Sequence, residues 1–454
     1  MELEEKIINL LDKKKYAEIK QELTNLEAAD IAILFDEMPD NKLPLLFRLL
    51  PKELAAEVFV ELESDMQELL ITGFSDSELK EVWEELYVDD AVDIIEEMPA
   101  NVVKRILKHS DSEMRHSINE ILNYPKDSAG SIMTTEYVDL RENMTVEDAF
   151  THIRRTGVDK ETIYTCYVTD SNRKLMGLVS VKELLLADQS EQLTEIMETN
   201  IIYANTTDDK EEVARQFGKY DFLAIPVVDK ERRLVGIVTV DDAIDVLEEE
   251  NTEDIEKMAA ITPSDKPYLK TGVIETYKKR IPWLLLLMIS ATFTGKIISS
   301  FEDALSACVV LTSFIPMLMD TGGNSGGQSS VTIIRSMSIG DVEMRDVFKV
   351  IWKELRVAIA CGVTLAAANF VKMMLIDRSS IVASGQNAVI VAAVVCLTLV
   401  ITVIIAKLIG CTLPMAAKKI GFDPAVMASP FITTIVDAVS LIVFFRIAVI
   451  LLRI

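Results

Sequence analysis

Hydrophobic and polar residues follow two different patterns along the chain, and the pattern changes near residue 270. Before this point, short apolar groups recur at helical spacing or as brief continuous runs between charged residues. After it, five stretches are apolar for the roughly 20 residues needed to cross about 30 Å of hydrocarbon. They cover about residues 281–300, 304–334, 353–376, 387–412 and 424–452. The pattern predicts a multidomain membrane protein that ends in an α-helical bundle of five transmembrane helices.

The first part of the chain contains a repeat with a period of 60 residues. The segment DIAILFDEMPDN at 30–41 matches DAVDIIEEMPAN at 90–101, with Asp30 and Asp90 in register. Each copy has helical apolar spacing, a proline that stops the helix, and then a second helical pattern. We therefore predict an all-α helical-repeat domain over residues 1–128.

A second repeat follows with an offset of 59 residues. RKLMGLVSVKELL at 173–185 matches RRLVGIVTVDDAI at 232–244, and each copy follows a short β-rich run. This order predicts two α/β units of strand, turn, strand and helix that pack side by side. We place these two units at residues 129–190 and 191–248. A connecting helix at 249–272 and a transmembrane domain at 273–454 complete the predicted organisation.

Charge separates the two parts of the chain further. Residues 1–270 carry 61 acidic against 30 basic side chains, whereas the remainder carries 11 against 16. So acidic a surface repels nucleic acid and anionic lipid and attracts cations. Five cysteines without a CxxC pair and three scattered histidines indicate neither a disulfide framework nor a zinc site.

The basic residues of short loops predict the orientation in the membrane. Lysines and arginines gather before the first span, between the second and third, and between the fourth and fifth. The start of the chain has no signal-peptide pattern. We therefore expect a multi-pass protein of the cell membrane with cytosolic N-terminal domains and, after five spans, an outward C-terminus.

The segment MDTGGNSGGQSS at 319–330 interrupts the second apolar stretch with an acid, four glycines and several amides and hydroxyls. Small and polar residues at membrane depth either let helices approach closely or line a water-filled pathway. The segment alone leaves both interpretations open.

Asp437 lies midway along the fifth stretch, where a carboxylate costs about 3 kcal/mol or more unless a cation or water attends it. The alternative is a structural pair with Arg446, but nine helical residues separate the two by about 13 Å. The position favours an ion site.

The second repeat resembles cystathionine-β-synthase (CBS) domains, of which the turn GIVTVDD is typical. In such pairs a hydroxyl and a following acid lie near a bound adenosine nucleotide, and the resemblance assigns Ser180, Thr239 and Asp242 to these positions. The alternative for the hydroxyls is capping of the next helix.

The whole chain resembles the MgtE family of magnesium channels. The resemblance rests on the order of helical repeat, CBS pair, connecting helix and apolar spans, on TGGNSGGQSS, on TTIVDAVSL around Asp437, and on the junction YPKDSAGSIMTTEYV. CBS-bearing chloride channels place the CBS pair after the membrane part instead. Gly327 departs from the family, whose members more often carry a polar residue there.

The resemblance implies a homodimer with a Mg²⁺ pore on its two-fold axis, lined by spans two and five. Asp437 would hold the hydrated ion, with the lining from Gly322, Gly323, Asn324, Gly326, Gly327 and Gln328. It also implies that cytosolic Mg²⁺ closes the pore by bridging acids of the helical, CBS and connecting regions. The matching residues are Asp89, Asp93, Glu211, Asp221, Asp242, Asp245, Glu250, Glu253 and Asp254.

The predicted function is therefore Mg²⁺ uptake through a Mg²⁺-selective channel without enzymatic activity, with ATP as a possible ligand of the CBS pair. Three alternatives stay open. The acidic run after the second CBS unit is also compatible with a solvated helix face. The transported ion is alternatively another divalent such as Co²⁺ or Mn²⁺. The chain is alternatively a membrane-anchored sensor of Mg²⁺ or nucleotide that passes no ion.

Overall fold

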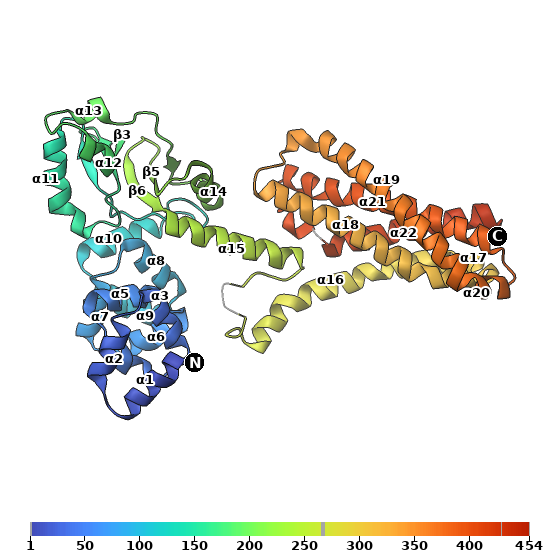
Figure 1. Cartoon of the computed structure of the whole chain (residues 1–454), viewed down its shortest axis with the longest axis horizontal. Coiled ribbons are helices and arrows are strands. Elements are labelled where there is room, and N and C mark those ends of the chain that lie inside the picture. Colours follow the sequence, from blue (N-terminus) through green and yellow to red (C-terminus); the bar gives the residue numbers. More distant parts are fainter. Residues whose placement is uncertain (1, 265–267, 428, 454) are drawn as a thin grey trace. The chain divides into compact units, whose positions relative to one another are not determined.

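The protein folds into two units, Met1–Leu247 and Glu248–Ile454. The computed structural model describes residues 2–264, 268–427 and 429–453 (Figure 1). The first unit holds a helical domain and two α/β repeats, and the second holds the long apolar helices. The predicted fold class is confirmed, except for the number of transmembrane spans.

The helical domain consists of ten short helices, and the 60-residue repeat places α3 and α8 at equivalent positions (Figure 1). In each copy a proline follows the helix, and a second helix then begins. The ten helices are α1 (Glu2–Asp12), α2 (Tyr16–Leu23), α3 (Ala28–Asp36), α4 (Leu43–Phe47), α5 (Lys52–Val60), α6 (Ser64–Gly73), α7 (Asp76–Trp83), α8 (Val88–Glu97), α9 (Ala100–His109) and α10 (Ser112–Ile121).

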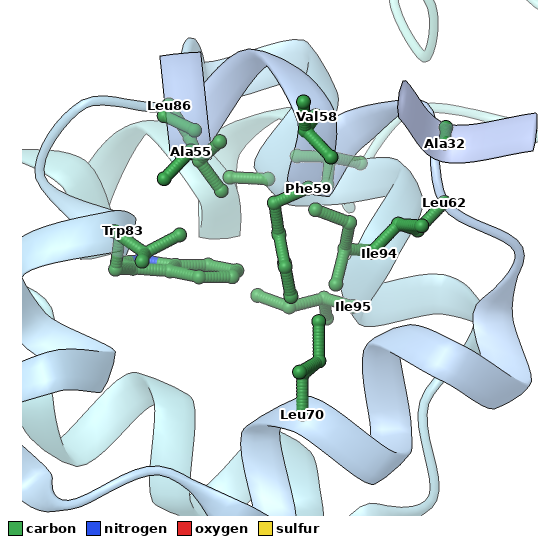
Figure 2. Close-up of a cluster of buried hydrophobic side chains, with 14 of the residues drawn as sticks. Ala32, Ala55, Val58, Phe59, Leu62, Leu70, Trp83, Leu86, Ile94 and Ile95 are labelled. Carbon is green, nitrogen blue, oxygen red and sulfur yellow. The ribbon is translucent and has the colours of Figure 1, made fainter. Parts of the chain in front are cut away.

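Large apolar side chains from several of these helices form the core of the domain. Figure 2 shows Trp83 and Phe59 turned toward one another, with Leu70, Ile94 and Ile95 beside them. Removing a buried aromatic side chain such as Phe59 costs about 3–5 kcal/mol. This core fixes the position of α8, which carries two of the candidate site residues.

Each CBS repeat contains a three-stranded sheet whose last two strands are antiparallel, and the offset of 59 residues holds for both strands. The first sheet has β1 (Asp139–Arg141), β2 (Thr165–Thr169) and β3 (Leu175–Ser180). The second has β4 (Ala204–Asn205), β5 (Ala224–Val228) and β6 (Leu234–Thr239). The intervening helices are α11 (Val146–Thr156), α12 (Val181–Leu186), α13 (Leu193–Ile196) and α14 (Lys210–Tyr220), with a short 3₁₀ turn, η1 (Gly157–Asp159).

The two repeats exchange backbone hydrogen bonds. Thr134, which precedes the first sheet, pairs with Ile237 of β6, and Glu198, which precedes the second sheet, pairs with Leu178 of β3. The glycine of each repeat, Gly177 or Gly236, leaves the space for this crossing segment, because a Cβ there would lie within 3 Å of it. The CBS pair is therefore one interlocked structure.

The helix α15 (Val240–Met258) leaves β6 and runs from the first unit into the second. The second unit then contains α16 (Val273–Ser300), α17 (Glu302–Ala307), α18 (Ile315–Ser338), α19 (Val347–Lys372), α20 (Arg378–Ala383), α21 (Ala388–Lys419) and α22 (Ser429–Leu452). Short helical turns join them, η2 (Val309–Phe314), η3 (Met344–Asp346), η4 (Met373–Asp377) and η5 (Ala425–Met427).

Among the described residues, four helical segments are long and apolar enough to cross a membrane: Val273–Ser300, Met344–Ala383, Ala388–Lys419 and Ala425–Leu452. The fifth predicted span corresponds to α18, whose 24 residues include the glycine-rich segment. The same glycines and polar residues lower its mean hydropathy, so the count of five spans is not confirmed. The helix α18 packs extensively against α21 and α22.

Candidate functional site

Five acidic side chains of the first unit form what we call the α8–α15 cluster: Asp89, Asp90, Glu161, Asp241 and Asp242. They come from the first turn of α8, the loop after η1, and the first turn of α15. Asp89 is buried, with 7% of its surface exposed, although its carboxylate accepts only a 3.0 Å hydrogen bond from the Asp90 amide among the bonds described. One oxygen of Glu161 is buried and accepts no hydrogen bond from the described residues.

The acids of the α8–α15 cluster disturb one another's ionisation. Burial, and then the negative charge of Asp242, raises the pKa of Asp89 well above its ordinary value. The pKa of Asp90 is raised to about 7, first by burial and then by the negative charge of Asp242. The pKa of Glu161 is raised to about 8, first by burial and then by the negative charge of Asp90. Burial raises the pKa of Asp242 to about 6, against a hydrogen bond from Thr239 that lowers it.

These properties suit a hydrated divalent cation. Near neutral pH these raised pKa values keep protons on some carboxyl groups of the α8–α15 cluster. A cation that displaces the protons would relieve the same repulsion between carboxylates. In the described ranges no three acids, histidines or cysteines already converge as a metal-binding group. Mg²⁺ keeps most of its water and contacts few carboxylates directly, so this spacing fits an ion held partly through water.

The structure places the other predicted sensor residues of the first unit differently. Asp93 follows Asp89 by one turn of α8 and is exposed, and Asp245 is exposed one turn after Asp242 on α15. Glu211 forms an ion pair with Arg215 on α14. Asp221 ends α14 with a left-handed backbone (φ 56°) and is exposed. Asp89, Asp242 and Asp245 therefore lie together, and Glu211 and Asp221 lie on another helix.

A second acidic group lies where α15 ends, within the second unit. Asp254 accepts a 3.3 Å hydrogen bond from Ser338 at the end of α18, and burial followed by the charge of Asp423 raises its pKa. Lys257 is paired with Glu253 and lies 2.7 Å from the Asp423 carboxylate in the loop before α22. Glu250 is half-buried one turn before Asp254. The predicted residues Glu250, Glu253 and Asp254 therefore lie on one stretch of α15.

Both hydroxyls assigned to nucleotide binding lie in helix caps. Ser180 donates to Glu183 (2.9 Å) and accepts from the Glu183 amide (3.2 Å), which forms a capping box at α12. Thr239 likewise donates to Asp242 at the start of α15. The capping alternative therefore describes both residues, and their role toward a nucleotide stays a prediction.

The helix α18 has a polar side and a glycine side. Asp320, Asn324 and Gln328 recur every four residues and are exposed; Asn324 donates to Asp320 at 3.1 Å. We call these three residues the polar stripe. Asp437 on α22 is half-buried, and Asp320 acts on it electrostatically. Arg446, the alternative partner of Asp437, is exposed farther along α22.

Gly322 and Gly326 lie on the other side of α18, and together with Gly323 they are buried against α21 and α22. A Cβ on Gly322 would lie 2.9 Å from Thr402 of α21, and one on Gly326 would lie 2.7 Å from Ile432 of α22. Gly323 faces Thr433, and Gly327 is buried. Within one subunit the glycines allow close helix packing, and their part in lining a pathway stays a prediction.

Sequence reasoning missed several acids that the structure adds. Asp90 and Asp241 are sequence neighbours of predicted residues, and Asp320 lies at the start of the glycine-rich segment. Their positions in the sequence could therefore have identified these three as site residues. Glu161 and Asp423 lie in loops, and only the folded chain brings them to the acidic groups.

Comparisons with known proteins agree with this arrangement. Residues 315–447 match the profile of the MgtE divalent cation transporter, 26–127 match the MgtE intracellular N domain, and 129–190 and 193–249 match CBS domains. The chain is 36% identical to the magnesium transporter MgtE of Thermus thermophilus over 96% of this chain and 95% of that one. It is 33% identical to the magnesium transporter MgtE of Bacillus subtilis over 98% and 96%.

Two solved structures are similar to the first part of the chain. One is the cytosolic domain of the Mg²⁺ channel MgtE in complex with ATP, with a TM-score of 0.51 and 37% identity over 53% of this chain and 98% of that one. The other is the soluble part of a magnesium transporter, with a TM-score of 0.51 and 30% identity over 55% and 98%.

Proposed function

Because the chain belongs to the MgtE family of magnesium transporters, which are not enzymes, we propose that it is a Mg²⁺-selective channel for Mg²⁺ uptake, closed by cytosolic Mg²⁺. It is a multi-pass membrane protein. We place its N-terminal domains in the cytosol and its C-terminus outside the cell membrane, as the loop charges predict.

The observation that carries this proposal is the polar stripe of α18, whose first member, Asp320, acts electrostatically on Asp437 of α22. A carboxylate and two amides on the outside of a membrane helix are costly against lipid, because hydrocarbon offers them no hydrogen bonds. Asn324 donates one hydrogen bond to one oxygen of the Asp320 carboxylate, which satisfies only part of its capacity to accept hydrogen bonds. Water and a cation would satisfy the rest, and oxygen ligands of this kind suit hydrated Mg²⁺.

A second copy of the chain would complete this pathway. Two polar stripes facing each other across a two-fold axis would enclose water between them and hide both from lipid. The two Asp437 carboxylates would then attract one divalent ion. We therefore propose a homodimer, with the lining from Asn324 and Gln328 and with Gly322, Gly323, Gly326 and Gly327 allowing the close helix approach.

The α8–α15 cluster and the acids at the end of α15 would form the gate. Mg²⁺ at Asp89 and Asp242, and near Asp245 and Asp93, would bind the helical domain to α15 by replacing repulsion with bridging. At the other end of α15, Glu253 and Asp254 approach the loop before α22 through Lys257 and Asp423, and Glu250 lies one turn before Asp254. The sensor role of Glu211 and Asp221 on α14 rests on the family resemblance alone.

We also propose that the CBS pair binds ATP, as does the solved MgtE cytosolic domain that is 37% identical. Ser180 and Thr239 would exchange their capping bonds for the ligand. Titration of the purified chain with ATP, compared with a Ser180→Ala/Thr239→Ala variant, tests this role.

Proteoliposomes containing the purified chain test the main function. We expect Mg²⁺ uptake that millimolar Mg²⁺ on the side of the N-terminal domains suppresses, with little uptake of Ca²⁺ or Na⁺. Equal uptake of Co²⁺ and Mg²⁺ would favour a general divalent pathway, and the lack of any uptake would favour a sensor.

A further inference from the structure

Three helices of the second unit meet at a buried group of polar side chains, which we call the Ser329 cluster: Ser329 of α18, Glu354 of α19 and Lys407 of α21. Ser329 is 2% and Lys407 5% exposed, and the Glu354 side chain is 12% exposed. The Ser329 hydroxyl lies 2.6 Å from a Glu354 oxygen and 3.2 Å from the Lys407 nitrogen. The two charges are 4.0 Å apart, so the serine bridges them.

The chemistry of the three groups gives these bonds a direction. A lysine ammonium only donates, so the Ser329 oxygen accepts from Lys407, and the single hydroxyl proton is then donated to Glu354. Hydrogen bonds to ionised partners are short and strong, and water does not compete with buried ones. The serine thus fastens α18 to two other helices at once.

Ser329 lies on the side of α18 that carries Gly322 and Gly326. One residue corresponds to about 100° of helix rotation, which places Ser329 almost opposite the polar stripe. Gly410, one turn after Lys407, meets the Gly326 carbonyl so closely that no Cβ fits there. The glycines allow the close approach of α18 and α21 but have no side chains to interlock, so at this level of the helix the directed contacts come from the Ser329 cluster.

We propose that Ser329, Glu354 and Lys407 are positioning residues for the ion pathway, which fix the rotation of α18 and thereby direct Asp320, Asn324 and Gln328 toward the permeating ion. This inference rests on the proposed function. It assigns a role to three buried polar residues that do not touch the pathway themselves.

Variants of the full chain in proteoliposomes test this role. Lys407→Met and Glu354→Gln each leave one buried charge unpaired, whereas the double variant leaves none. Ser329→Ala removes only the bridge. Lys372→Met is the matched control, because Lys372 is also a helical lysine paired with an acid, Asp377 at 3.3 Å, but its side chain is 44% exposed.

The ratio of Mg²⁺ to Co²⁺ uptake separates positioning from mere stability, since the amount of folded protein scales both ions equally. We expect Ser329→Ala and the double variant to shift this ratio at least threefold. We expect each single charge variant to lower Mg²⁺ uptake about tenfold and the double variant to lower it no further, as for residues acting as a unit. Lys372→Met should match the wild type in both measurements.

Two results would overturn the inference and are distinguishable. If the wild type takes up no Mg²⁺, the proposed function fails and the inference with it. If the wild type takes up Mg²⁺ but Ser329→Ala and the double variant keep its ion ratio, the inference alone fails. Should the single variants not fold, Ser329→Ala and the double variant still decide the question, because neither buries an unpaired charge.

Discussion

Replacement of Asp90 by asparagine should stabilise the first unit when divalent cations are absent. The pKa of Asp90 rises from 3.8 to about 7, first through burial and then through the charge of Asp242. Three pKa units correspond to about 4 kcal/mol at most, at about 1.4 kcal/mol per unit. For a unit of 247 residues, at about 2–4 °C per kcal/mol, that is a rise in Tm of roughly 8–16 °C at most.

The sign of this effect depends on pH. An acid whose folded pKa is raised destabilises the fold in full above that pKa, here about 7. The penalty shrinks as the pH falls and disappears below the ordinary value near 4. The advantage of Asp90→Asn should therefore be largest near pH 8 and small near pH 4.

Calorimetry of the purified full chain in a chelator, at about pH 8 and about pH 5, measures this effect. Asp30→Asn is the matched control, because Asp30 occupies the equivalent position of the 60-residue repeat but is exposed. Millimolar Mg²⁺ should raise the Tm of the wild type more than that of Asp90→Asn, since the variant has lost a ligand charge. An unchanged or lower Tm for Asp90→Asn in chelator at pH 8 would refute the repulsion on which the proposed gate depends.

Three further outcomes follow from the proposed pathway and gate. Asp437→Ala should abolish Mg²⁺ uptake while the dimer elutes normally, and full uptake by this variant would remove the pore role. Gly326→Val should disrupt the contact of α18 with α22, because its Cβ would lie 2.7 Å from Ile432. Loss of uptake with the dimer intact would indicate that the glycines line a pathway, whereas loss of the dimer would indicate a helix-packing role. Asp242→Asn/Glu250→Gln/Glu253→Gln should conduct at millimolar Mg²⁺ and lose Mg²⁺-dependent protection from protease, whereas closure and protection like those of the wild type would leave these acids as a solvated face.

The repeats made much of the fold predictable from the sequence. The 59-residue offset marks β2 with β5 and β3 with β6, because equivalent strands need the same apolar residues and the same glycine at the crossing. The α18 helix shows where such reasoning fails. The polar stripe and the pair Gly322 and Gly326 lie on opposite sides of one continuous helix, but an average of hydropathy over a window merges the two sides.

Site residues were predictable only where one helix or one turn held them together. Asp242 and Asp245 follow from spacing on α15, and Asp320 follows from its distance of four residues to Asn324. Glu161 has no such signal, because its place beside Asp90 depends on how the first CBS repeat packs against the helical domain. The Ser329 cluster joins residues 25 and 78 positions apart, which no local pattern reveals.

The backbone bridges between the two CBS repeats also set an order of events during synthesis. Thr134 cannot form its backbone bridge until Ile237 has left the ribosome, about 100 residues later. At the usual rate of elongation this delay is roughly 5–20 s. Until then the segment at Thr134 lacks the strand β6 with which it pairs, and its unpaired backbone groups invite pairing with another chain. The nascent helical domain can fold during this interval, whereas the CBS pair must close in one late step that also starts α15.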